Sequence, residues 1–579
     1  MKILGISCFY HDSAAALVVD GVLRAAAQEE RFSGIKHDAG FPGQAIEFCL
    51  DKTGCGINDL DHIVFYDKPL TKFDRILSSY LATVPFSYNA FRTAMPAWLR
   101  RKLWLPQIIK KDLDYGGSVL FIDHHLSHAA GAFYSSPFEK AAILTVDGVG
   151  EWATASIGQG FGNEIRLRKA MNYPHSVGLL YSAFTYFLGF QVNSAEYKVM
   201  GLAPYGKPLY ADLIKDKIVR IFDDGSLQLN LHYFRFHYGL AMVGRRFERL
   251  FGRPRRLPES DLTDSDRNLA ASVQAVTEEI LLKMAAHCRE VTGEPDLCLS
   301  GGVALNCAAA GKLVKSNLYD RIYIQPAATD SGGAAGAAIY VDYSLTGRRD
   351  KIRQPYFSLG PAYTREEITS LLTDHRIPFG TESPGRIVSR AATALAGGKI
   401  VALFHRSMEF GPRALGFRSI LADPRQAAMK ERINRAVKFR EPFRPFAPVV
   451  IEEKAGDYFE PEMASPYMLF NFHVRESARK LIPAVTHVDG SARIQTVRRD
   501  NNPLLYDILG EFEKLTGVPV LLNTSLNLRG RPIARTPRDA LATFVSSGID
   551  LLIMENIIID KSELDSVSLN ELKLSAGQD

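Results

Sequence analysis

Two histidines four residues apart, His124 and His128 in DHHLSHAAGAF, lie on one face of any helix formed by that segment. Two imidazoles at this spacing can share a metal ion, whereas the alternative is a pair of capping or core histidines, with His125 directed elsewhere. Asp147 in LTVDGVG and Asp330 in ATDSGG follow predicted strands, where a short carboxylate projects into the ligand crevice of a sheet. Two nitrogens and two oxygens suit Fe²⁺, Mn²⁺ or Zn²⁺, and the identity of the metal stays open.

Glycine turns follow several predicted strands in the same half of the chain. They lie at Gly148, Gly301–Gly302 and Gly332–Gly333. Backbone amides in such turns approach phosphates and a nucleoside without a side chain in the way. The three turns together favour a nucleotide ligand.

A second set of polar residues, between positions 399 and 527, is rich in arginine. GPRALG and FRPFAP place arginine among Gly, Pro and Phe, whereas a solvated basic face would carry Lys and Glu at helical spacing. Guanidinium groups fixed among rigid turns suit bidentate capture of phosphate oxygens. The candidates are Arg406, Arg413, Arg418, Arg425, Lys438, Arg440 and Arg444, then His487, Asp489 and Arg493. Small amide and hydroxyl groups follow a predicted strand in VLLNTSLN, at Asn523, Ser525 and Asn527.

The elements that must position these residues form a duplicated α/β pattern. Segments beginning at Lys2 and Ala141 each contain a buried-type strand, a polar or acidic loop and a β-hairpin. Later strands, glycine turns and helices alternate in a βαβ rhythm, which predicts a mainly parallel sheet. Residues 70–113 have apolar spacing of three and four broken by prolines, which predicts inserted helices. KIRQPYFSLGPAYTREE breaks the rhythm and predicts a boundary near 357, with domains 1–357 and 358–579.

Length and composition favour an enzyme of at least two domains. The 579 residues exceed what one hydrophobic core usually supports. A net charge of +5, from 69 basic and 64 acidic residues, is too even to indicate nucleic acid or an anionic membrane as partner. Six cysteines without a C-x-x-C pair indicate free thiols in a reducing compartment. No apolar run approaches the roughly 18 residues of a membrane span, so the expected location is the cytoplasm.

The motifs resemble a known enzyme family. HDSAAALVVDG with QEERF, DHHLSH, SAEYKVMGLAPYGKP and SGGVALNC are similar, in the same order, to the carbamoyltransferases of antibiotic, toxin and nodulation-factor biosynthesis. The resemblance covers nearly the whole chain and implies a Kae1-like first domain, with the duplicated fold of actin, sugar kinases and Hsp70. It implies a YrdC-like second domain, an α/β domain with a twisted sheet and a basic concave face. It is weakest at 70–113 and 213–266, where acceptor specificity is expected.

The resemblance assigns expected roles to individual residues. His124, His128, Asp147 and Asp330 match the metal ligands, and the metal would bind the phosphate of a nucleotide. His11, in the turn after the first strand, matches a histidine that takes the proton of an acceptor hydroxyl; without the family, a turn histidine bonded to backbone is favoured. The nucleoside side matches Glu196, Lys198, Gly301, Gly302 and Asn306, and the carbamoyl phosphate and ATP positions match Arg413, Arg418, Lys438, Arg444, Arg493 and Ser525.

The implied reaction has two steps. In the second domain, carbamoyl phosphate yields carbamate, which attacks the α-phosphate of ATP to give carbamoyl adenylate and pyrophosphate, with arginines and Mg²⁺ neutralising the phosphates. In the first domain, the carbamoyl group passes to a hydroxyl of a small-molecule acceptor. The sequence does not select the acceptor, and it is compatible with a monomer or a homodimer.

Kae1-like and YrdC-like halves are also similar to the machinery that places threonylcarbamoyl on tRNA adenosine. Only the basic run RRFERLFGRPRRL invites this alternative, and one short cluster in a near-neutral protein is more often a solvated loop or a subunit contact. A scaffold that has lost its chemistry would lack ligands, whereas His11, the metal set and the arginines are all present.

Overall fold

The computed structural model describes residues 1–348, 356–564 and Leu572. The chain forms two compact units. The first comprises Met1–Glu29 and His37–Pro355, and the second comprises Glu30–Lys36 and Tyr356–Asp579. The short segment 30–36, which the sequence analysis placed in the first domain, therefore belongs to the second unit.

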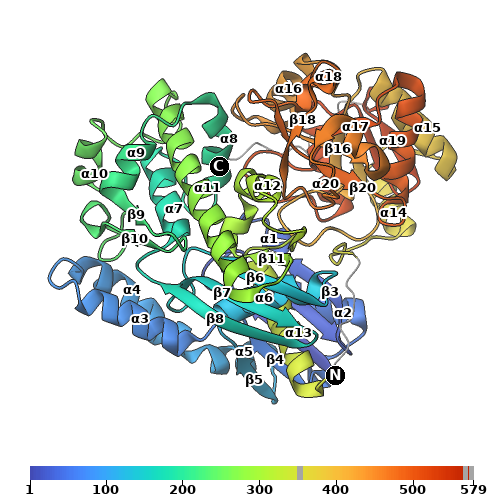
Figure 1. Ribbon diagram of the computed structural model, residues 1–579. Helices are drawn as coiled ribbons and strands as arrows, with labels where there is room; N and C mark the ends of the chain where they lie inside the picture. Colours follow the sequence, from blue (N-terminus) through green and yellow to red (C-terminus); the bar gives the residue numbers. More distant parts are fainter. Residues whose placement is uncertain (349–355, 565–571, 573–579) are drawn as a thin grey trace. The chain divides into compact units, whose positions relative to one another are not determined.

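The first unit begins with a five-stranded sheet of order β3-β2-β1-β4-β5. Strands β3, β4 and β5 of this sheet are labelled in Figure 1. Its strands are β1 (Lys2–Ser7), β2 (Ala14–Val19), β3 (Val22–Gln28), β4 (His62–Phe65) and β5 (Ser118–Phe121). The first three are antiparallel, and β4 and β5 run parallel to β1. The β2–β3 hairpin turns at Asp20 and Gly21, both with left-handed φ of 52° and 80°, as a two-residue Asp-Gly turn requires.

A second sheet of the first unit repeats this connectivity, with order β12-β11-β6-β7-β8. Its strands are β6 (Lys140–Val146), β7 (Ala153–Phe161), β8 (Glu164–Asn172), β11 (Asp296–Ser300) and β12 (Arg321–Ile324). Again the first three are antiparallel and the last two are parallel to the first. The internal duplication predicted from the sequence is thus confirmed, although the expectation of a mainly parallel sheet is wrong because each half contributes an antiparallel meander.

Two helices of the first unit each pack on the sheet of the opposite half. Helix α6 (His124–Ser135) follows the edge strand β5 but packs against β6 and β11 of the other sheet, and α13 (Asp330–Thr346) follows β12 but packs against β1 and β2. The two helices also pack closely on each other. A Cβ at Gly336 would lie 1.9 Å from the carbonyl oxygen of Ser127, so glycine is required for this approach. The close packing brings the N-terminal ends of both helices together.

Helices surround these sheets. Residues 70–113 form α3 (Pro69–Leu81), α4 (Tyr88–Arg100) and α5 (Leu105–Leu113), in agreement with the predicted insertion, except that Pro96 lies inside α4 and does not end it. The remaining larger helices are α2 (Gly43–Thr53), α7 (Val177–Phe187), α8 (Glu196–Leu202), α10 (Arg245–Leu250), α11 (Asp264–Thr292) and α12 (Cys307–Lys315). Among the described residues, no helix combines the length and apolar composition needed to cross a membrane.

The second unit is built on an eight-stranded mixed sheet of order β13-β23-β22-β14-β15-β21-β16-β20. The strands are β13 (Gly380–Thr381), β14 (Val401–Phe404), β15 (Arg418–Ala422), β16 (Ala447–Ile451), β20 (Gln495–Val497), β21 (Val520–Ser525), β22 (Leu551–Met554) and β23 (Ile557–Asp560). Helices α15 (Pro384–Ala396) and α19 (Pro503–Thr516) pack on it and form a large apolar core. Helices α14 (Arg365–Asp374), α16 (Ala428–Ile433) and α20 (Pro537–Val545) and a small sheet of β17 (Phe459–Glu460), β18 (Asn471–Val474) and β19 (Ser491–Arg493) complete it.

Candidate functional site

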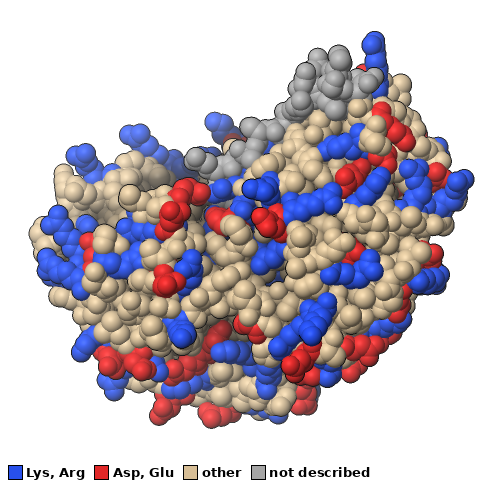
Figure 2. All heavy atoms as spheres, turned by 90° about the horizontal axis from the view of Figure 1, so that it is seen from above, with Lys and Arg blue, Asp and Glu red and all other residues tan. Residues whose placement is uncertain are grey.

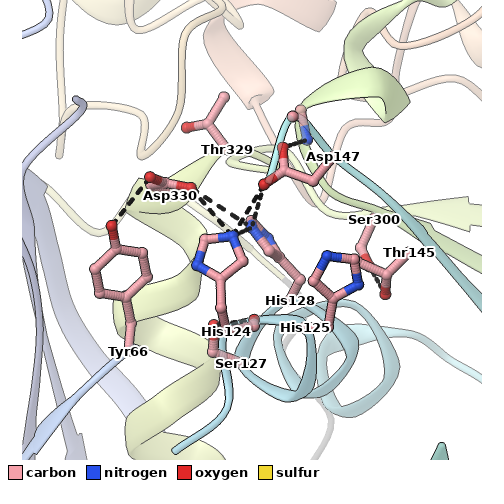
Figure 3. Close-up of polar contacts among 12 residues, drawn as sticks. Tyr66, His124, His125, Ser127, His128, Thr145, Asp147, Ser300, Thr329 and Asp330 are labelled. Atoms are coloured by element: carbon pink, nitrogen blue, oxygen red, sulfur yellow. Dashed lines mark hydrogen bonds and ion pairs between the residues drawn. The ribbon is translucent and has the colours of Figure 1, made fainter. Parts of the chain in front are cut away.

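Four side chains that are far apart in sequence converge in the first unit (Figure 3). His124 is the first residue of α6, and His128 lies one turn later. Asp330 is the first residue of α13, and Asp147 directly follows β6. One donor atom from each residue lies within 4.8 Å of the other three. The sheet duplication and the exchanged helices therefore produce the predicted arrangement.

The spacing of the donor atoms fits a shared cation. His124 Nε2 lies 2.9 Å from Asp147 Oδ2, 3.1 Å from His128 Nε2 and 3.7 Å from Asp330 Oδ1. His128 Nε2 lies 3.6 Å from Asp330 Oδ1 and 3.8 Å from Asp147 Oδ2. Ligand atoms about 2.1 Å from one ion lie roughly 3.0 to 3.4 Å apart, depending on the geometry. Two nitrogens and two carboxylate oxygens at such distances are a donor set suited to a divalent transition metal.

Electrostatics also favour positive charge among these residues. Burial would raise the pKa of Asp147, but the hydrogen bond from His124 and the charge of His128 hold it well below its usual value. Burial likewise opposes ionisation of Asp330, whose pKa is nevertheless lowered, chiefly by His11. The pKa of His124 is raised against the effect of burial by its hydrogen bond to Asp147 and the charge of Asp330. The two carboxylates thus remain ionised in a buried place, which requires a cationic partner.

His11 lies in the turn after β1, next to this cluster. Its Nε2 is 3.9 Å from Asp330 Oδ2, and its Nδ1 is 3.2 Å from Asp12 Oδ2. Burial lowers the pKa of His11, but the charge of Asp330 and the hydrogen bond to Asp12 outweigh it and raise the pKa to about 10. His125 faces away, toward Ser156, with its Nδ1 3.0 Å from the hydroxyl. Burial lowers the pKa of His125 to about 3, as suits a structural histidine.

The predicted nucleoside residues lie on the second half of the first unit. Gly301 and Gly302 form the turn after β11, and the Gly302 amide donates to Asp147 Oδ1 at 3.0 Å. A Cβ at Gly301 would lie 2.3 Å from the carbonyl oxygen of Val146, so this glycine permits close backbone packing. Asn306 caps α12 and exchanges two hydrogen bonds of 3.0 Å with Gln274 of α11.

Glu196 and Lys198 lie on α8. Glu196 Oε1 accepts hydrogen bonds of 2.9 Å from the Ser182 hydroxyl and the Asn193 amide. Lys198 is buried, with its ammonium 5.7 Å from the centre of the Phe190 ring. Glu196 and Asn306 therefore have partners on α7, on α11 and in the loop before α8, whereas the Gly302 amide contacts Asp147 of the metal-ligand cluster.

In the second unit, one predicted cluster forms around Lys438, at the end of the π-helical turn Asn434–Lys438. The Lys438 ammonium donates to the Ser525 carbonyl, to the Ser525 hydroxyl at 3.2 Å and to Asn527 Oδ1 at 2.8 Å. Ser525 in turn donates to Asn527 Oδ1 at 2.6 Å. The sequence-predicted lysine, hydroxyl and amide are thus brought together at the end of β21.

The loop that carries Arg413 is held by a buried carboxylate. Glu409 Oε1 accepts hydrogen bonds from the amides of Leu415, Phe417 and Arg418 at 2.7, 3.0 and 3.1 Å. The carbonyl of the neighbouring Leu415 accepts from Gln495 of β20 at 2.9 Å. Arg413 is half-buried on this rigid loop.

Two predicted ligands of the second unit are buried and have hydrogen-bond partners within the fold. The guanidinium of Arg418 is fully buried, lies 3.7 Å over the Phe404 ring, and donates to carbonyl oxygens of His405, Arg406, Phe417 and Pro361 at 2.8 to 3.1 Å. Asn523 is also buried and donates to Gln495 Oε1 at 2.7 Å. Both side chains therefore use most of their donors within the fold, and Arg418 Nε is the one donor of the two side chains without a hydrogen-bond partner among the described residues.

The remaining predicted residues lie in turns of the second unit. Asp489 Oδ1 accepts from the Ser491 amide at 3.0 Å and lies 3.6 Å from His487 Nδ1. Burial raises the pKa of Asp489, but the neighbouring His487 and the hydrogen bonds from Ser491 lower it overall. Arg493 ends β19 and is half-buried. Arg444 is half-buried, 3.6 Å from Glu441.

Comparison with known proteins identifies the family. The model of the carbamoyltransferase N-terminus matches residues 2–339, and the model of the carbamoyltransferase C-terminus matches residues 392–561. The chain belongs to the carbamoyltransferase family.

Relatives align over almost the whole carbamoyltransferase chain. An uncharacterised protein of Synechocystis sp. is 48% identical, with 97% of each chain covered. Nodulation protein NolNO of Sinorhizobium fredii is 37% identical, covering 98% of this chain and 81% of that protein. The structure of full-length HypF in its phosphate- and nucleotide-bound form covers 60% of this chain and 56% of its own, with 13% identity and a TM-score of 0.32, which is too low to support an inference.

Sequence reasoning missed three residues that shape the sites of this carbamoyltransferase. Glu151 accepts from the His124 amide at 2.9 Å and so satisfies the N-terminal end of α6. Tyr66 donates to Asp330 Oδ2 at 3.1 Å, and Glu409 organises the Arg413 loop. Glu151 lies four residues after Asp147 in the same acidic loop, so its position was the one available signal. Tyr66 and Glu409 lie in segments without a motif of their own.

Proposed function

We propose that this carbamoyltransferase makes carbamoyl adenylate in its second unit and transfers the carbamoyl group to a hydroxyl of a small molecule in its first unit. Membership of the family and the converging His124, His128, Asp147 and Asp330 carry the proposal. The nodulation protein among its relatives supports a sugar-like or secondary-metabolite acceptor. The reaction is proposed to take place in the cytoplasm, in a monomer or homodimer.

Adenylate formation needs a positively charged site that positions two phosphorylated substrates. Arg413 and Arg444 are half-buried in loops, and Arg493 is half-buried at the end of β19. Lys438 is fixed by Ser525 and Asn527. Water cleaves carbamoyl phosphate into carbamate and inorganic phosphate. The carbamate oxygen then attacks the α-phosphorus of ATP, the bond to pyrophosphate breaks, and a mixed anhydride forms. Arginine and lysine offset the charge on the departing pyrophosphate, together with substrate-bound Mg²⁺. We assign this chemistry to a YrdC-like second domain, 358–579.

Transfer takes place at the converged cluster of the first unit, a Kae1-like domain of residues 1–357. The acceptor oxygen attacks the carbamoyl carbon, His11 Nε2 takes its proton, and the bond to the phosphate oxygen breaks to release AMP. A bound Fe²⁺, Mn²⁺ or Zn²⁺, held by His124, His128, Asp147 and Asp330, would supply Lewis-acid stabilisation of the phosphate. Positive charge there would also offset the carboxylates that raise the pKa of His11, leaving its imidazole able to accept a proton.

The tRNA alternative finds no support in the basic run at residues 245–256. Arg253 lies 2.7 Å from Asp266, Arg255 donates to the Tyr186 carbonyl at 2.8 Å, and Arg256 donates to the Leu188 carbonyl at 2.6 Å. Arg246 also contacts His232 Nδ1 at 3.0 Å, so four of the six arginines in the run have partners inside the first unit. On the face seen in Figure 2, basic and acidic side chains are interspersed, unlike the basic footprint of a nucleic-acid site.

The decisive experiment measures pyrophosphate release from ATP by the purified, metal-loaded protein. Release that depends on carbamoyl phosphate, in the absence of any acceptor, is the expected result. Pyrophosphate release that needs threonine and bicarbonate instead would favour the tRNA reaction. A protein that releases no pyrophosphate with either donor would contradict the proposed adenylate step.

A further inference from the structure

The turn that carries His11 is held by a second segment of the first unit, residues 37–40, which we call the strap. The Phe9 amide donates to the Ala39 carbonyl and the Ser13 amide to the Asp38 carbonyl, both at 2.9 Å. Asp38 Oδ1 also accepts from the Gly40 amide at 2.7 Å, which fixes the strap itself. The backbone on both sides of His11 is therefore tied to the strap.

Asp12 is the polar centre of this arrangement. Its carboxylate is buried, with one oxygen 3.2 Å from His11 Nδ1 and the other 2.7 Å from His37 Nδ1. One carboxylate thus links the imidazole beside the metal-ligand cluster to an imidazole of the strap. Burial raises the pKa of Asp12, but the hydrogen bonds from the two histidines lower it far below its usual value.

The backbone is strained at the same place. Phe9, Asp12 and His37 adopt left-handed φ angles of 68°, 51° and 55°. Residues with a side chain rarely adopt this conformation, and it persists only where the surrounding structure determines it. Here it directs the side chains of Asp12 and His37 toward each other.

The contact between Asp12 and His11 fixes the tautomer of His11. A carboxylate only accepts hydrogen bonds, so Nδ1 of both imidazoles carries a proton. The other nitrogen of a neutral His11, Nε2, is then the proton acceptor, and it is the atom that lies on the Asp330 side. Orientation by a carboxylate at Nδ1 is a general way to fix the tautomer of a base.

We propose that Asp12 and His37 are positioning residues that hold His11 in the tautomer and ring orientation needed for carbamoyl transfer. The proposal rests on the proposed function of the first unit. His37 locks the Asp12 carboxylate, and Asp12 locks the His11 ring. Neither residue is required to contact a substrate.

The test compares two nucleophiles, glycerol at molar concentration and hydroxylamine. Glycerol must lose a proton as it attacks, whereas hydroxylamine attacks as a neutral amine and traps the adenylate as hydroxyurea. Asp12→Asn keeps the size of the side chain and tolerates a left-handed φ. It should lower glyceryl carbamate formation by at least about 100-fold, with hydroxyurea and pyrophosphate formation changed less than about threefold.

Variants of the strap separate positioning from folding. His37→Ala should lower glyceryl carbamate formation about tenfold, and His37→Asn, which retains a donor near the position of Nδ1, should restore most of it. Asp38→Asn, a matched change that still accepts from the Gly40 amide, should leave all products unchanged.

Each alternative result has a distinct meaning. Equal loss of both products in Asp12→Asn, or normal glyceryl carbamate formation, would overturn the positioning role. A wild-type protein that makes hydroxyurea but no glyceryl carbamate would contradict the transfer step, and with it this inference. A wild-type protein that releases no pyrophosphate would instead contradict the adenylate step.

Discussion

The two units use their charged side chains in opposite ways. In the first unit, His124, His128, Asp147 and Asp330 direct their donor atoms at one another, so their charges are balanced within one buried cluster. In the second unit, the buried guanidinium of Arg418 instead directs its charge at backbone carbonyl oxygens of its own fold. Metal-ligating side chains that point at one another indicate a binding site. A buried cationic side chain surrounded by carbonyl oxygens indicates a role in holding the fold, even when both occur in motifs of the same family.

The largest expected effect comes from removing a convergent carboxylate. Asp330→Asn should reduce bound metal to background and lower carbamoyl transfer by about 10⁴-fold, because an essential anionic donor is lost. Metal content by mass spectrometry and hydroxyl carbamate formation check this. Asp123→Asn, an exposed carboxylate paired with Lys68 next to His124, is the matched control. Full metal content in Asp330→Asn would place the metal elsewhere.

Removing the imidazole beside the cluster should be nearly as severe. His11→Asn should lower transfer by about 10³-fold, the scale of general-base catalysis, while pyrophosphate release and metal content stay at wild-type levels. Coupled measurement of pyrophosphate and carbamate product on one preparation checks this. Loss of pyrophosphate release in His11→Asn would instead place the adenylate-forming step in the first unit.

Replacing Arg418 should lower the stability of the fold more than it lowers the rate of pyrophosphate release. Arg418→Met removes four hydrogen bonds to buried carbonyls and should lower the free energy of unfolding by about 3 kcal/mol. Urea unfolding followed by circular dichroism measures this loss. An unchanged unfolding midpoint combined with lost pyrophosphate release would return Arg418 to the substrate site and break the contrast between the units.

Arg444, unlike Arg418, is assigned to the proposed adenylate-forming site. Arg444→Ala should slow carbamoyl-phosphate-dependent pyrophosphate release about 30-fold, as expected for one lost charge-assisted contact to phosphate, with unchanged metal content. Steady-state pyrophosphate kinetics measure the change. The matched control is Arg432→Ala, whose guanidinium is exposed and bonded to Asp550. Equal effects of both variants would mean that Arg444 contributes only general positive charge.

The sequence predicted the first site better than the second for a physical reason. His124 and His128 are placed by helical spacing, and Asp147 and Asp330 by their positions after strands, so local rules locate all four. In the second unit, the fate of an arginine depends on tertiary packing: Arg413 lies on a turn, whereas Arg418 begins a fully buried strand. Residue type and a neighbouring glycine do not distinguish the two.

In the fold, too, some features were predicted from local sequence and others depend on long-range contacts. Strand and hairpin signals predicted the duplication, because β1 and β6 are short buried runs followed by turn residues. Local sequence patterns did not predict that residues 30–36 belong to the second unit. Glu30 and Arg31 are buried there, and Arg31 donates to the Gly411 carbonyl across 380 positions of sequence. A single sequence carries no signal of such a long-range contact.

The smallest expected effect is the contribution of His405 to the pH dependence of stability. The pKa of this histidine is shifted in the opposite direction from that of His11. Burial and the charge of Arg418 lower the pKa of His405 to about 3, whereas carboxylates raise that of His11 to about 10. Between about pH 6.5 and pH 3, His405 is protonated in the unfolded chain but neutral in the folded chain. The free energy of unfolding should therefore fall by about 1.4 kcal/mol for each unit that the pH drops in this range.

Urea unfolding of the wild type and of His405→Gln between pH 4.5 and 7 isolates this contribution. Glutamine can still donate to the Gly416 carbonyl, which His405 Nε2 contacts at 2.9 Å, but it cannot take up a proton. The stability difference between the two proteins should therefore narrow toward low pH. Parallel pH curves would mean that His405 can be protonated in the folded state, which would contradict a scaffold cation beside it.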